Sequence, residues 1–325
     1  MSGNLKKYYL FFTFLLVSFL FFKCKSSKNT LTLTFDKINY PIDNQFNEQK
    51  IELGEKLFFD KRLSLDETVS CATCHKPGLA FTDGLAVSDG VLGRKTTRNS
   101  SSILNAAFLP KVMFDGEVAT LEMQAIVPIQ EHTEMAMKMK DLIEKLRKIP
   151  EYQDAAKKIF NRDFDPFVLT RSIAAYERTL ISDNSNFDKY YYQKRKFALS
   201  KNARAGFKVF SEKLYCTKCH SLPYFTTFKI ENNGYTELNS EDLGRFRIHS
   251  DSNDIGKFKV PSLRNVSATA PYMHDGRFET LSEVIDFYAN GGRNVYNQSE
   301  IIKKFTLTKK EKSQLIEFLE NLEDF

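Results

Sequence analysis

The sequence predicts an all-α protein built from two similar domains. Apolar residues recur at helical spacing along most of the chain, and no segment shows a convincing alternation of apolar and polar residues. One order of features also occurs twice: a helix, a cysteine motif, an irregular segment and then further helices. With 325 residues, the chain is long enough for two domains that each bury a core. We therefore expect domains over residues 40–198 and 199–325.

The first residues have the form of an export signal. Lys6 and Lys7 precede an apolar run over residues 8–22, which predicts a signal peptide over residues 1–23. Cys24 ends this run, and the polar residues that open the 24–39 segment are of the kind that tethers a lipid-modified cysteine to a folded domain. A plain signal peptide and an uncleaved membrane anchor are the alternatives. We expect a periplasmic protein, anchored to the membrane if Cys24 carries lipid.

The first predicted domain is helical from about Asn44 onward. Apolar residues between 51 and 58 lie mostly on one helical face. Residues 137–160 predict one or two amphipathic helices interrupted at Pro150, and residues 168–180 predict a long helix. A turn cluster over residues 183–186 then leads to a lysine-rich hinge over residues 190–201.

The second predicted domain begins with a helix from residue 203 that leads into the second cysteine motif. Residues 231–257 are rich in Asn, Ser, Asp and Gly, which predicts a long irregular loop. Helices over residues 281–288 and 309–322 close the domain, and Asn290 with two glycines ends the first of them.

The charge pattern argues against nucleic acid as a partner. The formal net charge is +6, but the lysines are dispersed among acidic residues and form no basic stripe. We expect no nucleic-acid binding.

Two short motifs carry the strongest chemical signal. Residues 71–75 (CATCH) and 216–220 (CTKCH) share the spacing C-x-x-C-H, which is the c-type haem attachment sequence. The two thiols add to the vinyl groups of one haem, and the adjacent histidine is then held beneath the ring as an iron ligand. A disulfide pair, a redox dithiol and a four-cysteine zinc site are the alternatives. The predicted haem residues are Cys71, Cys74 and His75 for the first haem, and Cys216, Cys219 and His220 for the second.

Further short segments resemble those of a known family. They are LFFD (57–60), RLS (62–64), FTDG (81–84), RN (98–99), LNAAF (104–108), FDG (114–116), YERTL (176–180), KVPSLRN (259–265) and APYMHDG (270–276). On these residues the chain resembles the bacterial di-haem cytochrome c peroxidases and their relative MauG, an oxidase that completes a tryptophan-derived cofactor in a partner enzyme. The resemblance runs from about residue 54 to 322. It implies two cytochrome c-like domains, each with one covalent haem c.

The resemblance also implies a catalytic pair above the first haem, Gln124 and Glu134. A carboxylate there would take a proton from the bound peroxide and return it to the departing oxygen. Gln124 would orient the peroxide through a hydrogen bond. Without the family motif, both residues would be ordinary members of a helix surface.

Three departures from the typical peroxidases bear on mechanism. Val91 stands where those enzymes carry a histidine that caps the first iron, so we expect that iron to be open, as in MauG, unless His132 reaches it. Tyr288 stands where they carry a methionine ligand of the second haem and MauG a tyrosine; a phenolate favours ferric iron. Phe114 replaces the tryptophan between the haems, and the chain contains no tryptophan.

Asn99, Thr269 and Pro271 match the family's calcium position between the haems. The resemblance also implies that His274 packs beside the second haem, whereas His249 has no matched role and is expected to be solvated.

These observations predict a di-haem peroxidase. It would reduce hydrogen peroxide with electrons that a small c-type cytochrome or copper protein delivers to the second haem. The alternatives are a MauG-like oxidase acting on a protein or organic substrate, and a non-catalytic di-haem electron carrier. The family's frequent dimers make a homodimer the expected assembly.

Overall fold

A computed structural model describes Phe35 and residues 37–324. The predicted signal peptide, Cys24 and most of the predicted tether lie outside the described residues. Within the described part, no helix is long and apolar enough to cross a membrane.

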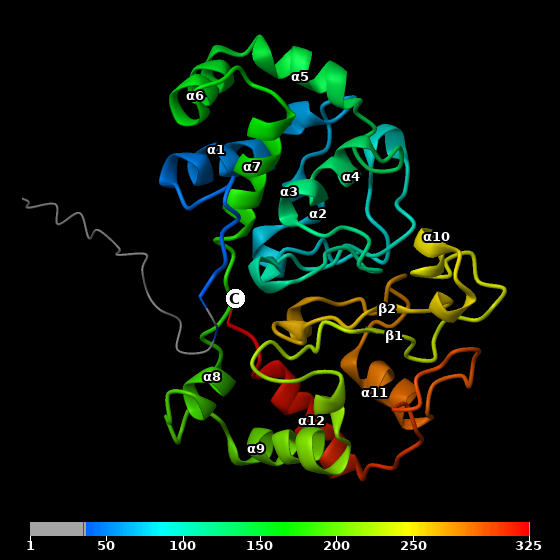
Figure 1. The fold of residues 1–325 in the computed structure, drawn as a ribbon. Helices are drawn as coiled ribbons and strands as arrows, with labels where there is room; N and C mark the ends of the chain where they lie inside the picture. Colours follow the sequence, from blue (N-terminus) through cyan, green and yellow to red (C-terminus); the bar gives the residue numbers. More distant parts are fainter. Residues whose placement is uncertain (1–34, 36, 325) are drawn as a thin grey trace, which may run out of the picture. The chain divides into compact units, whose positions relative to one another are not determined.

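The first half of the chain is helical, as expected; helices α1 to α7 occupy the upper part of Figure 1, and α8 lies in the lower part near α9. Pro150 stands at the first turn of a helix, which confirms the predicted interruption, because proline is tolerated there but not inside a helix. The helices are α1 (Glu48–Phe59), α2 (Cys71–Cys74), α3 (Leu121–Gln124), α4 (Ile126–Gln130), α5 (Met139–Arg147), α6 (Pro150–Phe160), α7 (Pro166–Glu177) and α8 (Asn186–Tyr191).

The second half contains α9 (Lys201–Lys208), α10 (Phe246–His249), α11 (Leu281–Ala289) and α12 (Lys309–Glu320). A π-helical turn over Val209–Lys213 extends α9 toward the second cysteine motif. The helix-rich structure agrees with the all-α expectation, and it contains one short pair of strands that the sequence did not indicate. Strands β1 (Ile230–Glu231) and β2 (Phe258–Lys259) pair antiparallel, with Ile230 opposite Lys259. Two residues per strand are too few to show an alternating pattern.

One helix crossing is built the same way in both halves. Helix α1 packs against α7, and α9 packs against α12. A Cβ atom at Gly54 would lie 1.9 Å from the Ser172 carbonyl oxygen, and one at Gly206 would lie 1.9 Å from the Gln314 carbonyl oxygen. Only glycine lets the two backbones approach so closely. The weak internal repeat in the sequence therefore corresponds to a repeated structural unit.

The repeat continues beyond the cysteine motifs. Asn105 and Asn265 both adopt the left-handed conformation, which asparagine tolerates better than most residues. Thr120 precedes α3 and Thr280 precedes α11, each as the N-cap residue. Helix α11 of the second half thus corresponds to the α3–α4 segment of the first.

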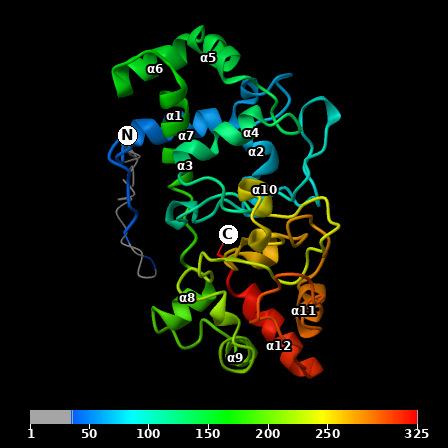
Figure 2. The ribbon, with the colours of Figure 1, turned by 45° about the vertical axis from the view of Figure 1, so that its right-hand side comes forward.

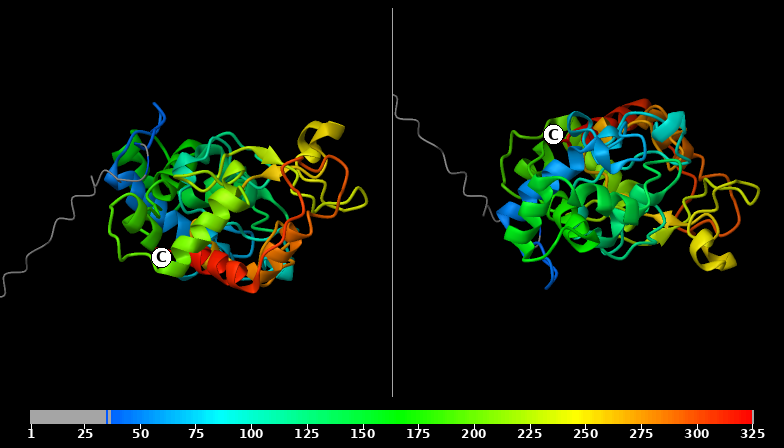
Figure 3. Two further views of the ribbon diagram at one scale, coloured as in Figure 1. Left: turned by 90° about the horizontal axis from the view of Figure 1, so that it is seen from below. Right: turned by 90° about the horizontal axis from the view of Figure 1, so that it is seen from above.

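Each half has its own apolar core. Leu57, Leu142 and Ile173 belong to the first core, and Phe210 and Phe318 belong to the second. Phe187 of α8 packs in the second core although it precedes the expected boundary at residue 198. The described residues form part of one compact unit, so the division into two domains stays a prediction. Figure 2 shows the same two groups of helices after a 45° turn, and Figure 3 views the molecule from below and from above, where the two groups overlap.

An ion-pair network joins the long loop of the second half to the first half. Arg98 binds Asp115 (Nη1–Oδ2 2.9 Å) and Asp242 (Nε–Oδ2 2.6 Å). Arg247 of α10 also binds Asp115 (Nε–Oδ2 2.5 Å), which is fully buried. The 231–257 loop was expected to be irregular; it carries α10 and is held by these contacts. Because several charges interact at one site, the network stabilises the fold more than an isolated surface ion pair would.

Candidate haem-binding cavity

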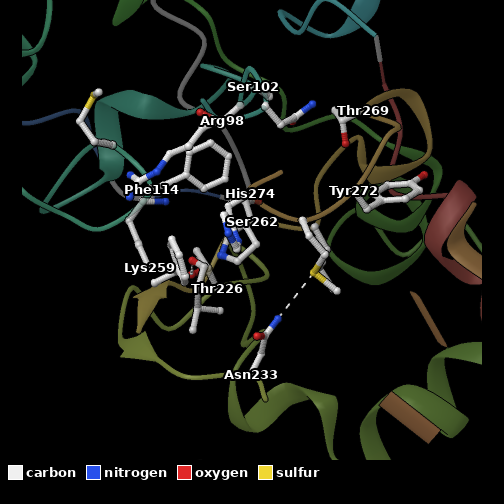
Figure 4. Close-up of a pocket in the computed structure, with 18 of the residues that line it drawn as sticks. Arg98, Ser102, Phe114, Thr226, Asn233, Lys259, Ser262, Thr269, Tyr272 and His274 are labelled. Atoms are coloured by element: carbon white, nitrogen blue, oxygen red, sulfur yellow. Dashed lines mark hydrogen bonds between the residues drawn. The ribbon is translucent and has the colours of Figure 1, made fainter. Parts of the chain in front are cut away.

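A cavity of about 1130 Å³ lies between the two halves. Residues of both C-x-x-C-H motifs line it, including Cys74, His75, Cys216, Cys219 and His220. Its wall mixes apolar side chains with a few polar ones, as is usual for sites that take an organic cofactor. Figure 4 shows part of this wall.

The first motif forms a short helix with its histidine at the end. Thr73 Oγ1 accepts a hydrogen bond from the Ser70 backbone N–H at 3.0 Å, which holds the first turn of α2. His75 follows as the C-cap residue, and its Nδ1 lies 3.0 Å from the Phe81 carbonyl oxygen. Nδ1 donating to a carbonyl leaves Nε2 as the ring atom that can bind a metal.

The second motif orients its histidine in the same way. Cys216–Lys218 forms one 3₁₀ turn, and His220 Nδ1 lies 3.1 Å from the Phe225 carbonyl oxygen and 3.2 Å from that of Pro261. Burial lowers the pKa of both His75 and His220 and so favours the neutral ring that a metal requires.

The thiols fit covalent haem better than a disulfide or a zinc site. All four motif cysteines are free, so no disulfide links either pair. No group of three or more His, Cys, Asp or Glu that could hold a metal ion occurs among the described residues, which leaves a four-cysteine zinc site without support. Burial raises the pKa of each thiol, whereas zinc binds thiolates. Each motif offers two free thiols and an oriented histidine, which is the set that haem c requires, and all of these residues except Cys71 line the cavity.

Glu134 lies in the cavity wall of the first half, in the loop after α4. Its backbone is held on both sides, because its carbonyl accepts from Val91 N–H at 2.9 Å and its N–H donates to the Glu131 carbonyl at 3.0 Å. Burial, and next the charge of Glu131, raise the pKa of Glu134 to about 7. A carboxyl group with that pKa can both accept and donate a proton near neutral pH.

Gln124 lines the same cavity as the last residue of α3. A buried ion pair fixes this short helix, because Glu122 binds Arg178 at the end of α7 (Oε1–Nη1 2.5 Å and Oε2–Nη2 3.0 Å). The Gln124 amide nitrogen lies 3.9 Å from the sulfur of Met113, so it has only a weak protein partner. The structure thus brings Gln124 and Glu134 to one cavity, while their catalytic roles stay predictions.

Val91 and His132 bear on whether the first iron is open. Val91 is fully buried in the first core, and its aliphatic side chain offers no ligand. The His132 side chain is 78% exposed and pairs with Glu131 (Nδ1–Oε1 2.6 Å). His132 reaches the edge of the cavity, but this pairing directs its Nδ1 toward the carboxylate.

Tyr288 also lines the cavity, from helix α11. Asn233 Nδ2 donates to the Tyr288 hydroxyl at 3.2 Å, and the same nitrogen lies 3.6 Å from the Met273 sulfur, the contact dashed in Figure 4. Burial raises the pKa of the Tyr288 phenol, and the Asn233 hydrogen bond opposes that rise. The thiols of Cys219 and Cys216 are close enough to affect the same pKa, which places the phenol near the second motif.

Phe114 lies where the two halves meet. It lines the cavity, and its carbonyl oxygen accepts from the backbone N–H of Lys259 at 2.7 Å. Figure 4 shows Phe114 and Lys259 in the same part of the wall. A residue of the first half is thereby tied to β2 of the second.

The predicted calcium residues Asn99, Thr269 and Pro271 all line the cavity. Asn99 N–H donates to the His274 carbonyl at 2.7 Å, and Asn99 Nδ2 donates to the Leu85 carbonyl at 2.7 Å. The side-chain oxygen of Asn99 is therefore the atom left to bind a cation, and calcium binding stays a prediction.

The two remaining histidines differ in environment. The His274 ring lines the cavity and stacks on Phe258 with centroids 4.3 Å apart. His249 is exposed, as expected for a solvated histidine, and its Nε2 lies 2.7 Å from Arg245 Nη2.

Two polar residues of the cavity had no role in the sequence analysis. Asn233 lies in the loop that composition alone described as irregular, and nothing in its local sequence distinguishes it from the other asparagines there. Glu177 is buried beside Cys71 with its Oε2 atom unpartnered, and burial raises its pKa to about 8. In the sequence, the only feature that could have singled out Glu177 was its place in the YERTL segment (176–180).

Sequence comparisons agree with these features. A family model described as di-haem cytochrome c peroxidase matches residues 48–196. The chain is 36% identical over 317 residues to cytochrome-c peroxidase IdrP1 of Pseudomonas sp. strain SCT, covering 87% of this chain and 83% of that protein. It is 34% identical over 290 residues to the methylamine utilization protein MauG of Methylorubrum extorquens, covering 88% and 82%.

Solved structures show the same architecture. A MauG-like protein associated with microbial copper homeostasis superposes with a TM-score of 0.82 at 32% identity, covering 90% of this chain and 94% of that one. The di-haem peroxidase BthA of Burkholderia thailandensis gives a TM-score of 0.77 at 22% identity, covering 90% and 92%, and supports the fold alone.

Proposed function

The chain belongs to the family of di-haem cytochrome c peroxidases and MauG, and on that premise we propose that it reduces hydrogen peroxide to water with electrons from a small redox protein. The observation that carries the proposal is Glu134, a carboxyl group in the cavity wall whose pKa is raised to about 7 by burial and by the charge of Glu131. An electron carrier has no use for such a group.

Six residues would hold the two haems. Cys71 and Cys74, and Cys216 and Cys219, would form the thioether bonds, and His75 and His220 would bind the irons through Nε2. Haem iron supplies the redox chemistry of O–O cleavage when it is bound. Tyr288 is the proposed second ligand of the haem in the second half.

The chain's own contribution to cleavage is proton transfer and orientation. Glu134 in its ionised form would first accept the proton of one peroxide oxygen. It would then donate that proton to the other peroxide oxygen, which departs when the O–O bond breaks, so that this oxygen is released as water and not as hydroxide. The Gln124 amide nitrogen is available to donate a hydrogen bond to the peroxide, since its contact with Met113 is long. Both effects depend on positions held by backbone bonds and by the Glu122–Arg178 pair.

A MauG-like oxidase acting on a protein or organic substrate is the second candidate. The observations that favour it are Tyr288 in the wall of the second haem site and Val91 in the core, where a capping histidine would otherwise stand. The lack of tryptophan in the whole chain argues against the long-range oxidation that MauG performs through such residues.

Steady-state turnover separates these candidates. The purified holoprotein, with its haem content measured as the pyridine haemochrome, is mixed with peroxide and a reduced small cytochrome c or copper protein. Rapid oxidation of the donor supports the peroxidase. Peroxide consumption without donor oxidation favours the oxidase. No reaction with peroxide would leave an electron carrier and overturn the proposal.

Four further features belong to the same proposal. Calcium would bind at Asn99, Thr269 and Pro271. The signal peptide would direct the protein to the periplasm, with a lipid at Cys24 as its anchor. The assembly would be a homodimer. Calcium analysis, mass spectrometry of the mature N-terminus and light scattering test these points in turn.

A further inference from the structure

The cavity wall contains a half-buried lysine, Lys259, that none of the roles above employs. Lys259 is the second residue of β2 and pairs with Ile230 of β1. Its backbone N–H donates to the Phe114 carbonyl at 2.7 Å, so the residue is fixed at the contact between the two halves. Its side chain lines the cavity.

The other cationic side chains that line the cavity are already accounted for. Arg98 and Arg247 belong to the ion-pair network described above, and Arg264 pairs with a buried aspartate. Lys303 lies on the exposed surface. Within the described part of the chain, the ammonium group of Lys259 makes neither a hydrogen bond nor an ion pair.

An unpaired ammonium group is costly inside a protein. Burial lowers the pKa of Lys259 to about 8, which still leaves most of the molecules charged at neutral pH. The fold therefore presents a positive charge to the cavity without an anion to balance it. A cofactor that brings its own anion into the cavity would balance that charge.

We propose that Lys259 binds a propionate carboxylate of a haem held in this cavity. The inference rests on the proposed function in one respect, because it requires that the chain carries haem. Each haem c has two propionates, and a carboxylate beside an ammonium forms a charge-assisted hydrogen bond. The same contact would place the charge of Lys259 near the contact of the two halves, where Phe114 replaces the family's tryptophan.

The contact has a consequence for one reduction potential. A propionate carries negative charge, and negative charge near iron favours the ferric state. Lys259 offsets that charge and so raises the potential of the haem whose propionate it binds. Only one of the two haems should respond to its removal.

The test compares three variants of the full-length holoprotein. Lys259→Gln removes the charge and keeps a hydrogen-bond donor, and Lys259→Arg keeps the charge. Lys310→Gln is the matched control, because Lys310 is an exposed lysine of α12 that does not line the cavity. Haem content is measured first as the pyridine haemochrome, and both midpoint potentials are then read by spectroelectrochemical titration.

In Lys259→Gln, we expect the equilibrium constant for reducing one haem to fall about tenfold, which corresponds to about 59 mV for a one-electron couple. The potential of the other haem, and both potentials in the Lys310→Gln control and in Lys259→Arg, should stay near those of the unmodified protein. If Lys259→Gln loses a haem that Lys259→Arg retains, the charge is needed to hold the cofactor, which also supports the proposal.

Three results would overturn it. The first is an unchanged pair of potentials in Lys259→Gln with both haems present. The second is an equal effect of Lys259→Gln and Lys259→Arg, which would make the role steric. The third is a Lys259→Gln shift that appears only with added inorganic phosphate, since a solution anion would then be the partner. A preparation of the unmodified protein without haem would instead count against the proposed function.

Discussion

Replacing Glu134 by glutamine gives the sharpest test of the catalytic assignment. The substitution keeps the size of the side chain and removes its acid–base chemistry. The two backbone hydrogen bonds that hold this residue, with Val91 and Glu131, are unaffected by it. We therefore expect both haem spectra to remain intact while peroxide turnover falls.

The magnitude follows from the environment of the carboxyl group. Its pKa of about 7 lets it exchange a proton at neutral pH, and a positioned acid–base group of this kind contributes about 10² to 10⁴ in rate. Turnover should thus fall by on the order of a hundredfold or more. Below pH 7 the carboxyl group is protonated and cannot accept the proton, so kcat/KM of the unmodified enzyme should fall about tenfold per pH unit.

The assay is stopped-flow and steady-state reduction of peroxide between about pH 5 and 8, which spans the pKa. Glu131→Gln is the matched control. Its negative charge raises the pKa of Glu134, so removing it should move the acid limb to lower pH and leave the plateau rate nearly unchanged. If Glu134→Gln keeps turnover within about threefold, another group transfers the proton and the catalytic assignment of Glu134 fails. His132 would then be the next residue to replace.

Three other outcomes are expected. Tyr288→Phe should remove the low-spin electron paramagnetic resonance signal of the second haem, and an unchanged spectrum would exclude Tyr288 as a ligand. Because Val91 offers no ligand, the resting ferric protein should show one high-spin and one low-spin haem. It should also react with peroxide in stopped flow without prior reduction. Two low-spin signals with no reaction would show that another residue caps the first iron. Asp188→Asn leaves the fully buried Arg264 without its carboxylate (Nη1–Oδ2 2.8 Å) and should lower the free energy of unfolding by about 3–5 kcal/mol in guanidinium titrations. Glu151→Gln, which breaks the exposed ion pair between Glu151 and Lys56, should change it far less, and equal losses would contradict the argument.

The helical elements were predictable because their signals are local. Pro150 marks the start of α6, and the periodic segments near residues 281 and 309 became α11 and α12 within two residues of the expected bounds. Helical spacing depends on residues three and four apart, which sequence inspection detects directly. The two-residue strands β1 and β2 left no such pattern. They pair only when residues 232–257, which lie between them in the sequence, fold back.

Some residues of the candidate site were also predictable from local sequence, and others were not. The cysteines and histidines of both C-x-x-C-H motifs are recognisable from spacing alone, because haem attachment needs them within five consecutive residues. Gln124, Glu134 and Tyr288 came from resemblance to a family, since an isolated glutamine, glutamate or tyrosine has no distinctive neighbourhood. Their shared position on one cavity is a tertiary result.

By itself, the sequence determined the fold class, the two haem motifs and the family to which the chain is related. The tertiary structure decided which residues meet. It raised the pKa of Glu134 to about 7, brought Asn233 to the Tyr288 hydroxyl, and left Lys259 charged and unpaired in the cavity wall within the described residues. The reason is physical: a pKa or a partnership depends on burial and on distances between atoms far apart in the chain, and neither quantity is contained in the local order of residues.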